Sequence, residues 1–151
     1  RSHFPEASLR TTLLTGFPGE KEEHFRTLAD FVQRVRFQHL GVFAFYPEEG
    51  IRAAELPGQV DQEVKEARRD ELMRIQAEIS REHLEAFRDR EMTVLVDRPN
   101  PEWPTLYEGR VWFQAPEVDG ICYVSGEDIS PGDMVRARID QTWDYDLAAL
   151  V

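Results

Sequence analysis

The stretch "LRTTLLTGFPGE", Leu9–Glu20, reads as a strand that runs into a glycine-flanked turn and then into the start of a helix. Its first part, residues 9–15, is rich in threonine and leucine and is typical of a strand. Gly16-Phe17-Pro18-Gly19 has the composition of a turn. The carboxylates of residues 20, 22 and 23 follow, where a helix N-terminus favours negative charge. The stretch therefore predicts a strand, a turn and a helix in this order.

The next residues predict a βαβ unit. Apolar side chains recur at helical spacing from Phe25 to Val35, and residues 40–46, "LGVFAFY", form an almost continuous apolar run. Such a run is typical of a strand that is covered on both faces. Strand, helix and strand within about 40 residues predict a parallel pair with a right-handed crossover. Two strands and one helix cannot cover both faces of a sheet, so we expect another chain or a further part of the same protein to complete it.

The remaining residues predict a long helix and a small barrel. A turn-rich connector spans residues 47–58, and residues 61–90 have the apolar stripe of one long helix. The expected stripe consists of Val64, Ala67, Leu72, Ile75, Ile79 and Phe87. Five short strand-like segments follow without helices: 92–96, 107–113, 121–124, 134–140 and 146–151. We therefore predict an α/β part over residues 1–57, a bridging helix over 58–90 and a five-stranded OB-like β-barrel over 91–151.

The negative charge of the chain is concentrated in its last third. Lys and Arg number 7 against 8 Asp and Glu in residues 1–57, 7 against 9 in 58–90, and 4 against 12 in 91–151, so the last part carries −8 of the net −11. A surface of this sign repels a phosphate backbone and favours a basic partner. A solvated acidic face that only aids solubility is an equally open interpretation. No signal peptide or membrane span is expected, which favours a cytoplasmic protein.

Residue types that carry chemistry are sparse. The single cysteine, Cys122, cannot hold a zinc ion or an iron–sulfur cluster alone, and the four histidines have no paired spacing, so no metal site is predicted. The glycine turn is either a structural turn or an anion site at a helix N-terminus. It lacks the Gly-Lys-Ser/Thr of a Walker A loop, and Glu20 would repel phosphate.

Three motifs together resemble the C-terminal part of a radical-SAM methylthiotransferase of the ribosomal-protein type. They are Leu9–Glu20, "GVFAFYPEEG" (Gly41–Gly50) and "GRVWFQAPEVDGICYV" (Gly109–Val124). The last lies in a barrel that resembles a TRAM domain. "APEVDG" and "PEEG" are similar to the ribosomal rather than the transfer-RNA branch of the family. The resemblance implies that residues 1–57 are part of a TIM-like radical-SAM barrel.

The resemblance also implies an activity. The intact enzyme would add a methylthio group to the β-carbon of an aspartate in the small-subunit ribosomal protein near the decoding centre. It would use S-adenosylmethionine and two [4Fe–4S] clusters, and a 5′-deoxyadenosyl radical would abstract the hydrogen. The Cys-x3-Cys-x2-Cys motif and three further cysteines of the family are absent here. This chain is therefore expected to be a fragment that holds no cluster and is inactive alone.

Site residues follow from the same resemblance. The wall of the cofactor pocket would consist of Arg10, Thr12, Leu14, Gly16, Phe17, Phe43 and Phe45. Leu14 and Phe17 would contact adenine, and Arg10 would bind the carboxylate of the methionine moiety. Recognition of the basic substrate protein would fall to Trp112, Glu117, Asp119, Asp144 and Asp146. Phe45-Tyr46 and Ile51 depart from the family, which usually has Tyr-Ser and Thr at these positions.

Two other functions remain open from the sequence. A transfer-RNA methylthiotransferase would use the barrel as an RNA-binding module, and aromatic strands of OB-like barrels do stack bases. The charge of −8 in residues 91–151 counts against this reading. A stand-alone adaptor that binds protein and has no catalytic parent is the other alternative.

Overall fold

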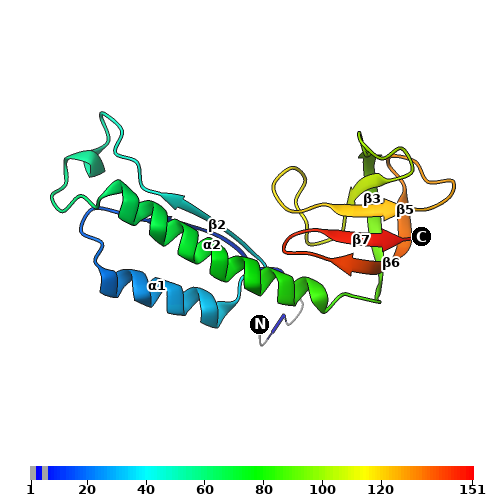
Figure 1. Cartoon of the computed structure of the whole chain (residues 1–151), viewed down its shortest axis with the longest axis horizontal. Coiled ribbons are helices and arrows are strands. Elements are labelled where there is room, and N and C mark those ends of the chain that lie inside the picture. The colour runs from blue at the N-terminus through cyan, green and yellow to red at the C-terminus, as the bar shows by residue number, and fades with distance from the viewer. Residues whose placement is uncertain (1–2, 5–6) are drawn as a thin grey trace. The chain divides into compact units, whose positions relative to one another are not determined.

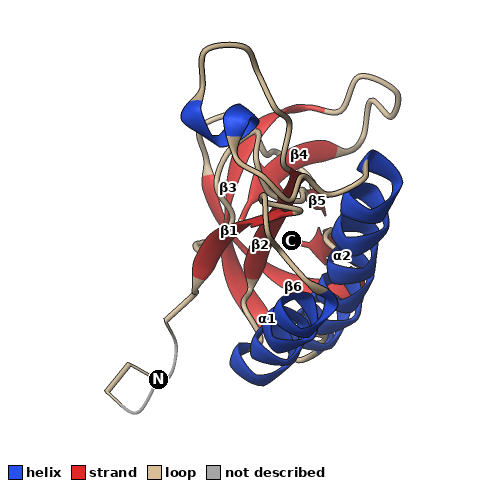
Figure 2. Ribbon diagram, turned by 90° about the vertical axis from the view of Figure 1, so that its left-hand side faces the viewer, coloured by secondary structure: helices blue, strands red, loops and turns tan. Residues whose placement is uncertain are grey.

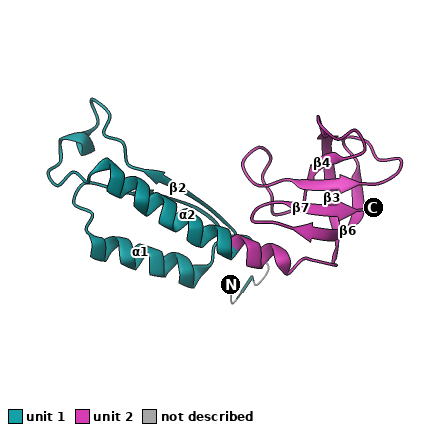
Figure 3. Cartoon of the chain, in the orientation of Figure 1, with its two compact units in different colours: residues 1–79 teal, residues 80–151 magenta. Residues whose placement is uncertain are grey.

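The computed structural model describes residues 3–4 and 7–151. The chain divides into two compact units, one up to Ile79 and the other from Ser80 to Val151 (Figure 3). The boundary falls within a helix, whereas the sequence predicted three segments that meet near residues 57 and 90. That three-part division stays a prediction, and each compact unit has its own apolar core.

The first unit contains the predicted βαβ arrangement. Its elements are β1 (Arg10–Thr15), α1 (Glu22–Val35), β2 (His39–Ala44), a short 3-10 helix η1 (Arg52–Glu55) and α2 (Gln62–Glu85), which continues past Ile79 (Figure 1). β1 and β2 pair in parallel, with Leu14 opposite Phe43. The parallel pair expected from the sequence is confirmed.

Both helices of this unit lie on the same side of the two-stranded sheet, as Figure 2 shows. The core between helices and sheet contains Phe25, Ala29, Val32, Phe37, Leu40, Val42, Leu72, Ile75 and Ile79. Because side chains alternate along a strand, the other face carries Arg10, Thr12 and Leu14 on β1 and Phe43 on β2, all of them exposed. One face of the sheet is thus packed and the other is open.

The first two turns of α2 differ from the prediction. Val64 and Ala67, expected in the apolar stripe, are exposed, whereas Lys65 and Arg68 are buried. The buried face still follows helical spacing through Leu72, and its Arg68 is accommodated by carboxylates near the end of β1 (described below). Charged side chains at these two positions concealed the true face of the helix.

The second unit is the predicted barrel. Its strands are β3 (Glu91–Pro99), β4 (Tyr107–Arg110), β5 (Cys122–Ser125), β6 (Met134–Thr142) and β7 (Leu147–Leu150), closed in the order β3-β4-β5-β7-β6. All pairs are antiparallel except β5 and β7, which are parallel. The five-stranded barrel expected from the sequence is confirmed, and closure leaves no unpaired sheet edge.

Two boundaries were predicted too long. α2 ends at Glu85 instead of Arg90, and Phe87 lies in the following turn, packed against the barrel core. β4 ends at Arg110 because the backbone then turns, with Gln114 N donating to Val111 O. Within the part of the chain that the structure describes, no helix has the length and apolar character that crossing a membrane requires.

Candidate functional site

The carboxyl ends of β1 and β2 meet at one edge of the sheet. Thr15, the last residue of β1, is fully buried, and its Oγ1 donates to Lys65 O on α2 at 3.2 Å. Its carbonyl accepts a hydrogen bond of 2.8 Å from the N–H of Phe45, just past the end of β2. In parallel sheets this edge is where ligands bind. The turn that begins at Gly16 and the start of α2 therefore lie at the edge of functional interest.

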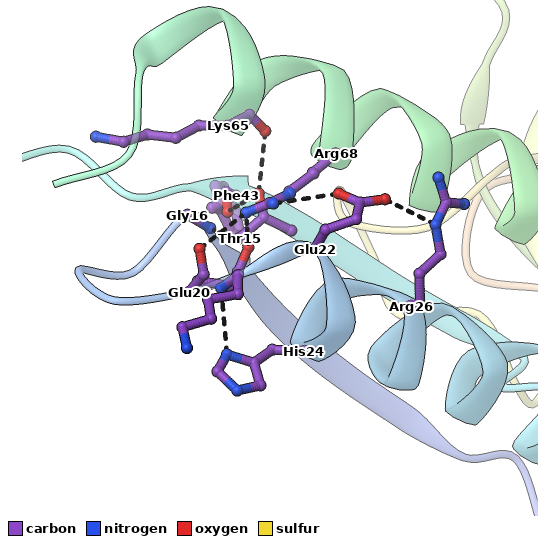
Figure 4. Close-up of polar contacts among 10 residues, drawn as sticks. Thr15, Gly16, Glu20, Glu22, His24, Arg26, Phe43, Lys65 and Arg68 are labelled. Carbon is purple, nitrogen blue, oxygen red and sulfur yellow. Dashed lines mark hydrogen bonds and ion pairs between the residues drawn. The ribbon is translucent and has the colours of Figure 1, made fainter. Parts of the chain in front are cut away.

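The glycine turn is closed by its own glutamate. The N–H of Gly16 donates to Glu20 Oε1 at 3.0 Å, and Gly16 has a φ of +74° (Figure 4). A side chain here would place its Cβ 2.2 Å from Lys65 Cγ, so α2 packs directly on the turn. Because the Gly16 N–H already donates to a carboxylate of the chain, the turn is not arranged as a phosphate cradle. The structural interpretation of the turn accounts for these contacts.

Arg68 joins α2 to the same turn. Its Nη1 lies 2.8 Å from Glu20 Oε1, the oxygen that also accepts the Gly16 bond, and its Nη2 lies 3.3 Å from Glu22 Oε2. The guanidinium is also 5.4 Å from the centre of the Phe25 ring. The side chains of Arg68 and Glu20 are only 8% and 12% exposed, so this ion pair is largely shielded from solvent.

Lys65 is buried at the same edge without a carboxylate. The residue is only 3% exposed, and its Nζ lies 5.2 Å from the centre of the Phe45 ring. Among the described residues, no Asp or Glu oxygen lies within ion-pair distance of this ammonium group. In Figure 4 its side chain extends away from Arg68.

The structure brings most of the expected cofactor-binding residues to this edge and to the open face. Thr12, Leu14 and Phe43 share the open face, on which Leu14 is 46% and Phe43 is 61% exposed. Arg10 is on the same face but at the amino end of β1.

The two remaining phenylalanines lie past the strand ends. Phe17 is exposed, and its ring contacts that of Phe45 edge-on at 5.4 Å. Phe45 itself is 6% exposed, covered by Phe17 and Lys65. Phe45 is thus the buried member of this aromatic pair, and Phe17 is the member exposed at the surface.

In the barrel, the expected recognition residues come from two adjoining loops. The loop between β4 and β5 presses on the turn between β6 and β7, since a Cβ on Gly120 would lie 1.9 Å from Tyr145 O. Ile121 N also donates to Asp146 Oδ1 at 2.7 Å. Trp112 and Glu117 on the first loop are exposed.

Three of the expected carboxylates have internal partners. Asp119 Oδ2 accepts a 2.6 Å hydrogen bond from Ala115 N, and Asp146 accepts the bond from Ile121. Asp144 forms an ion pair with Arg81, with Arg81 Nη2 at 2.7 Å from Asp144 Oδ1. These carboxylates shape the two loops, which leaves Trp112 and Glu117 as the exposed members of the set.

Every arginine of residues 91–151 is paired with a carboxylate. The pairs, at 2.6 to 3.3 Å, are Arg98 with Glu108, Arg110 with Asp97, Arg136 with Glu91, and Arg138 with Asp89. The positive charge of the barrel is therefore locally neutralised. The surplus is carried by exposed acids that include Glu102, Glu117, Glu127 and Asp128.

Cys122 behaves as a core residue. It is fully buried in the barrel, and burial raises the pKa of its thiol to about 12. Among residues 3–4 and 7–151, no group of three or more His, Cys, Asp and Glu side chains is placed to hold a metal ion. With a single cysteine, these residues do not fit an iron–sulfur cluster.

Sequence reasoning missed Lys65 and Arg68 as members of the edge. The available signal was their spacing: they lie three residues apart and continue with Leu72 as one helical face. Charged residues on a helix are usually solvated, so the apolar Val64 and Ala67 were assigned to the buried face instead.

Known proteins resemble the chain along its whole length. Residues 90–151 match the TRAM domain family. The chain is similar to proteins named ribosomal protein uS12 methylthiotransferase RimO from three bacteria. They are those of Nitratidesulfovibrio vulgaris (56% identity over 151 residues), Oleidesulfovibrio alaskensis (57% over 150) and Aquifex aeolicus (46% over 149). These alignments cover 98 to 100% of this chain but only 34 to 35% of each relative, so the chain spans about a third of their length. The resemblance to the ribosomal-protein type of methylthiotransferase is confirmed, and residues 90–151 are a TRAM domain.

Proposed function

We propose that the intact parent of this chain adds a methylthio group to an aspartate of ribosomal protein uS12 by radical-SAM chemistry in the cytoplasm. The observation that carries the proposal is identity of 51 to 57% with four uS12 methylthiotransferases over nearly the whole chain. At such identity, fold and site residues are usually shared. The parent would use S-adenosylmethionine and two [4Fe–4S] clusters.

The first unit would supply one wall of the cofactor site. S-adenosylmethionine, when bound, supplies the radical that abstracts a hydrogen atom from the substrate. The residues of this chain are compatible with contact to an adenine ring, because Leu14, Phe17 and Phe43 offer exposed apolar surface next to the carboxyl edge of the sheet. Thr12, Gly16 and Arg10 would add polar groups, with Phe45 as the buried ring that Phe17 contacts. The clusters do not fit here and would be held elsewhere in the parent.

The TRAM barrel would recognise the basic substrate protein. Its charge of −8 and the pairing of all its arginines support a positively charged partner and disfavour RNA, whose phosphates need a positive surface. Trp112 and Glu117 would make contact from the loop between β4 and β5, and Asp119, Asp144 and Asp146 would set the shape of that surface.

The full-length parent provides the test. With reconstituted clusters, S-adenosylmethionine and a reductant, it should add a methylthio group to purified uS12, detected as a mass increase. Glu117→Lys should weaken uS12 binding several-fold in low salt, with a smaller loss at high salt. Glu55→Lys, an exposed acid of the first unit, is the control. Preference for transfer RNA over uS12 in a competition assay would contradict the proposal.

The fragment itself is proposed to be inactive. Residues 1–151 should leave uS12 unmodified under conditions in which the full-length parent modifies it, because they contain one cysteine. Modification by the fragment alone would contradict this part of the proposal.

A further inference from the structure

Lys65 is a largely buried residue whose ammonium group has no carboxylate partner among the described residues. The side chain packs its stem against Gly16 and places its ammonium group 5.2 Å from the Phe45 ring. Three residues further along α2, Arg68 has two carboxylate partners, Glu20 in the turn after β1 and Glu22 at the start of α1. Lys65 therefore places an uncompensated positive charge next to an aromatic ring at this edge.

The position of Lys65 indicates a role for this charge. Both of its neighbours, Gly16 and Phe45, directly follow the carboxyl ends of β1 and β2. Its ammonium group therefore lies at the edge where ligands of parallel sheets bind, next to the Phe45 ring that Phe17 also contacts. A positively charged group without a carboxylate partner at such an edge is suited to binding an anionic ligand.

We propose that Lys65 is the anchor for a ligand carboxylate at the carboxyl edge of β1 and β2. This rests on the proposed function and deepens it. Arg10, the residue first expected to bind a carboxylate, begins β1 and lies about 16 Å from the carboxyl end of that strand, at roughly 3.3 Å per residue. Lys65 is at the edge itself, and its charge is not used by another group of the described chain.

The ligand is a carboxylate, and the reaction offers two sources of one. They are the methionine moiety of S-adenosylmethionine and the side chain of the target aspartate of uS12. In either case an ion pair would form between the ligand carboxylate and the Lys65 ammonium group, and such charge-assisted hydrogen bonds are stronger than neutral ones. The experiment distinguishes the two sources by removing the carboxylate from one ligand at a time.

The test compares Lys65→Met and Lys65→Gln with wild type in the full-length parent. Equilibrium binding is measured for S-adenosylmethionine and its decarboxylated analogue, and for uS12 with aspartate or asparagine at the target position. Methionine retains an apolar stem against Gly16 and removes the charge. For one of the two pairs, both variants should weaken binding of the carboxylate form at least tenfold and leave the carboxylate-free form unchanged.

Two controls complete the design. Lys65→Arg, which keeps the charge, should bind the carboxylate more tightly than Lys65→Gln, and Arg69→Met, which removes an exposed cation of the same helix, should bind as wild type. Equal losses with and without the ligand carboxylate, or no loss for either pair, would overturn the role of Lys65. Wild-type protein that binds neither S-adenosylmethionine nor uS12 would instead overturn the proposed function, an outcome seen before any variant is made.

Discussion

Arg68 and Glu20 form a shielded ion pair that fastens α2 to the turn after β1. One glutamate oxygen, Oε1, accepts from Arg68 Nη1 at 2.8 Å and from the N–H of Gly16 at 3.0 Å. A single carboxylate thereby holds both the helix and the turn. Glu20, which was predicted from the sequence to repel phosphate, itself accepts the hydrogen bond from the Gly16 N–H that an anion would otherwise bind.

Replacement of Arg68 by methionine should destabilise the first unit by about 3 kcal/mol, because it leaves Glu20 shielded from water without its counter-charge. The measurement is the free energy of unfolding in urea, followed by circular dichroism. Arg74→Met is the matched control on the same helix, since the exposed pair of Arg74 and Glu78 is worth at most about 0.5 kcal/mol. Equal effects of the two substitutions would show that the Arg68 pair is no stronger than a surface pair.

Gly16→Ala should be destabilising for two separable reasons. The positive φ of +74° costs an L-residue about 1 kcal/mol, and the new Cβ would lie 2.2 Å from Lys65 Cγ. Gly19→Ala is the control for the first term, because Gly19 has a φ of +85° and no atom within 4 Å of the new Cβ. Urea unfolding should give a larger loss at Gly16, and Lys65→Ala should recover part of the difference in a double-mutant cycle.

The elements of both units could be predicted because their periodicity is local. Alternation and helical spacing predicted β1, α1 and β2 to within a few residues, and turn residues separated the barrel strands. The buried face of α2 could not be predicted, because the burial of Arg68 depends on Glu20, 48 residues away. A charge is buried only when a partner is present, and the partner is not visible in a local pattern.

The same limit applies to the barrel loops. Asp144 and Asp146 resemble free acids in the sequence, but their partners, Arg81 and the Ile121 amide, are 63 and 25 residues away. Charge counting correctly indicated an acidic barrel, and only the contacts show which acids are already engaged. Trp112 and Glu117 are likewise exposed because the chain turns after β4. The apolar run "VWF" had instead predicted that the strand continues to residue 113.

Gln114 holds the loop between β4 and β5 in shape. Its side chain is buried, with Oε1 accepting from Val111 N at 3.0 Å and Nε2 donating to Gly120 O at 2.8 Å. Gln114→Ala should cost about 2 kcal/mol, since both backbone groups lose their partner. The readout is thermal unfolding of the barrel, with the exposed Gln141→Ala as the control. An unchanged melting temperature would mean that the loop holds its shape without Gln114.

Cys122 should make the barrel less stable as the pH rises into the alkaline range. Burial raises the pKa of its thiol to about 12, from an ordinary value near 9. Between these values the unfolded chain releases the proton and the folded chain keeps it, so the free energy of unfolding falls as pH rises. The expected slope is about 1.4 kcal/mol per pH unit above pH 9, and the contribution is fully present below pH 8. Cys122→Ala has no thiol to titrate and leaves a small cavity, so it should be less stable than wild type at pH 7.

The measurement is urea unfolding of both proteins at pH 7, 9 and 10.5. The difference between their free energies of unfolding should narrow by about 2 kcal/mol from pH 7 to pH 10.5. A difference that does not change with pH would contradict a thiol that the fold keeps protonated.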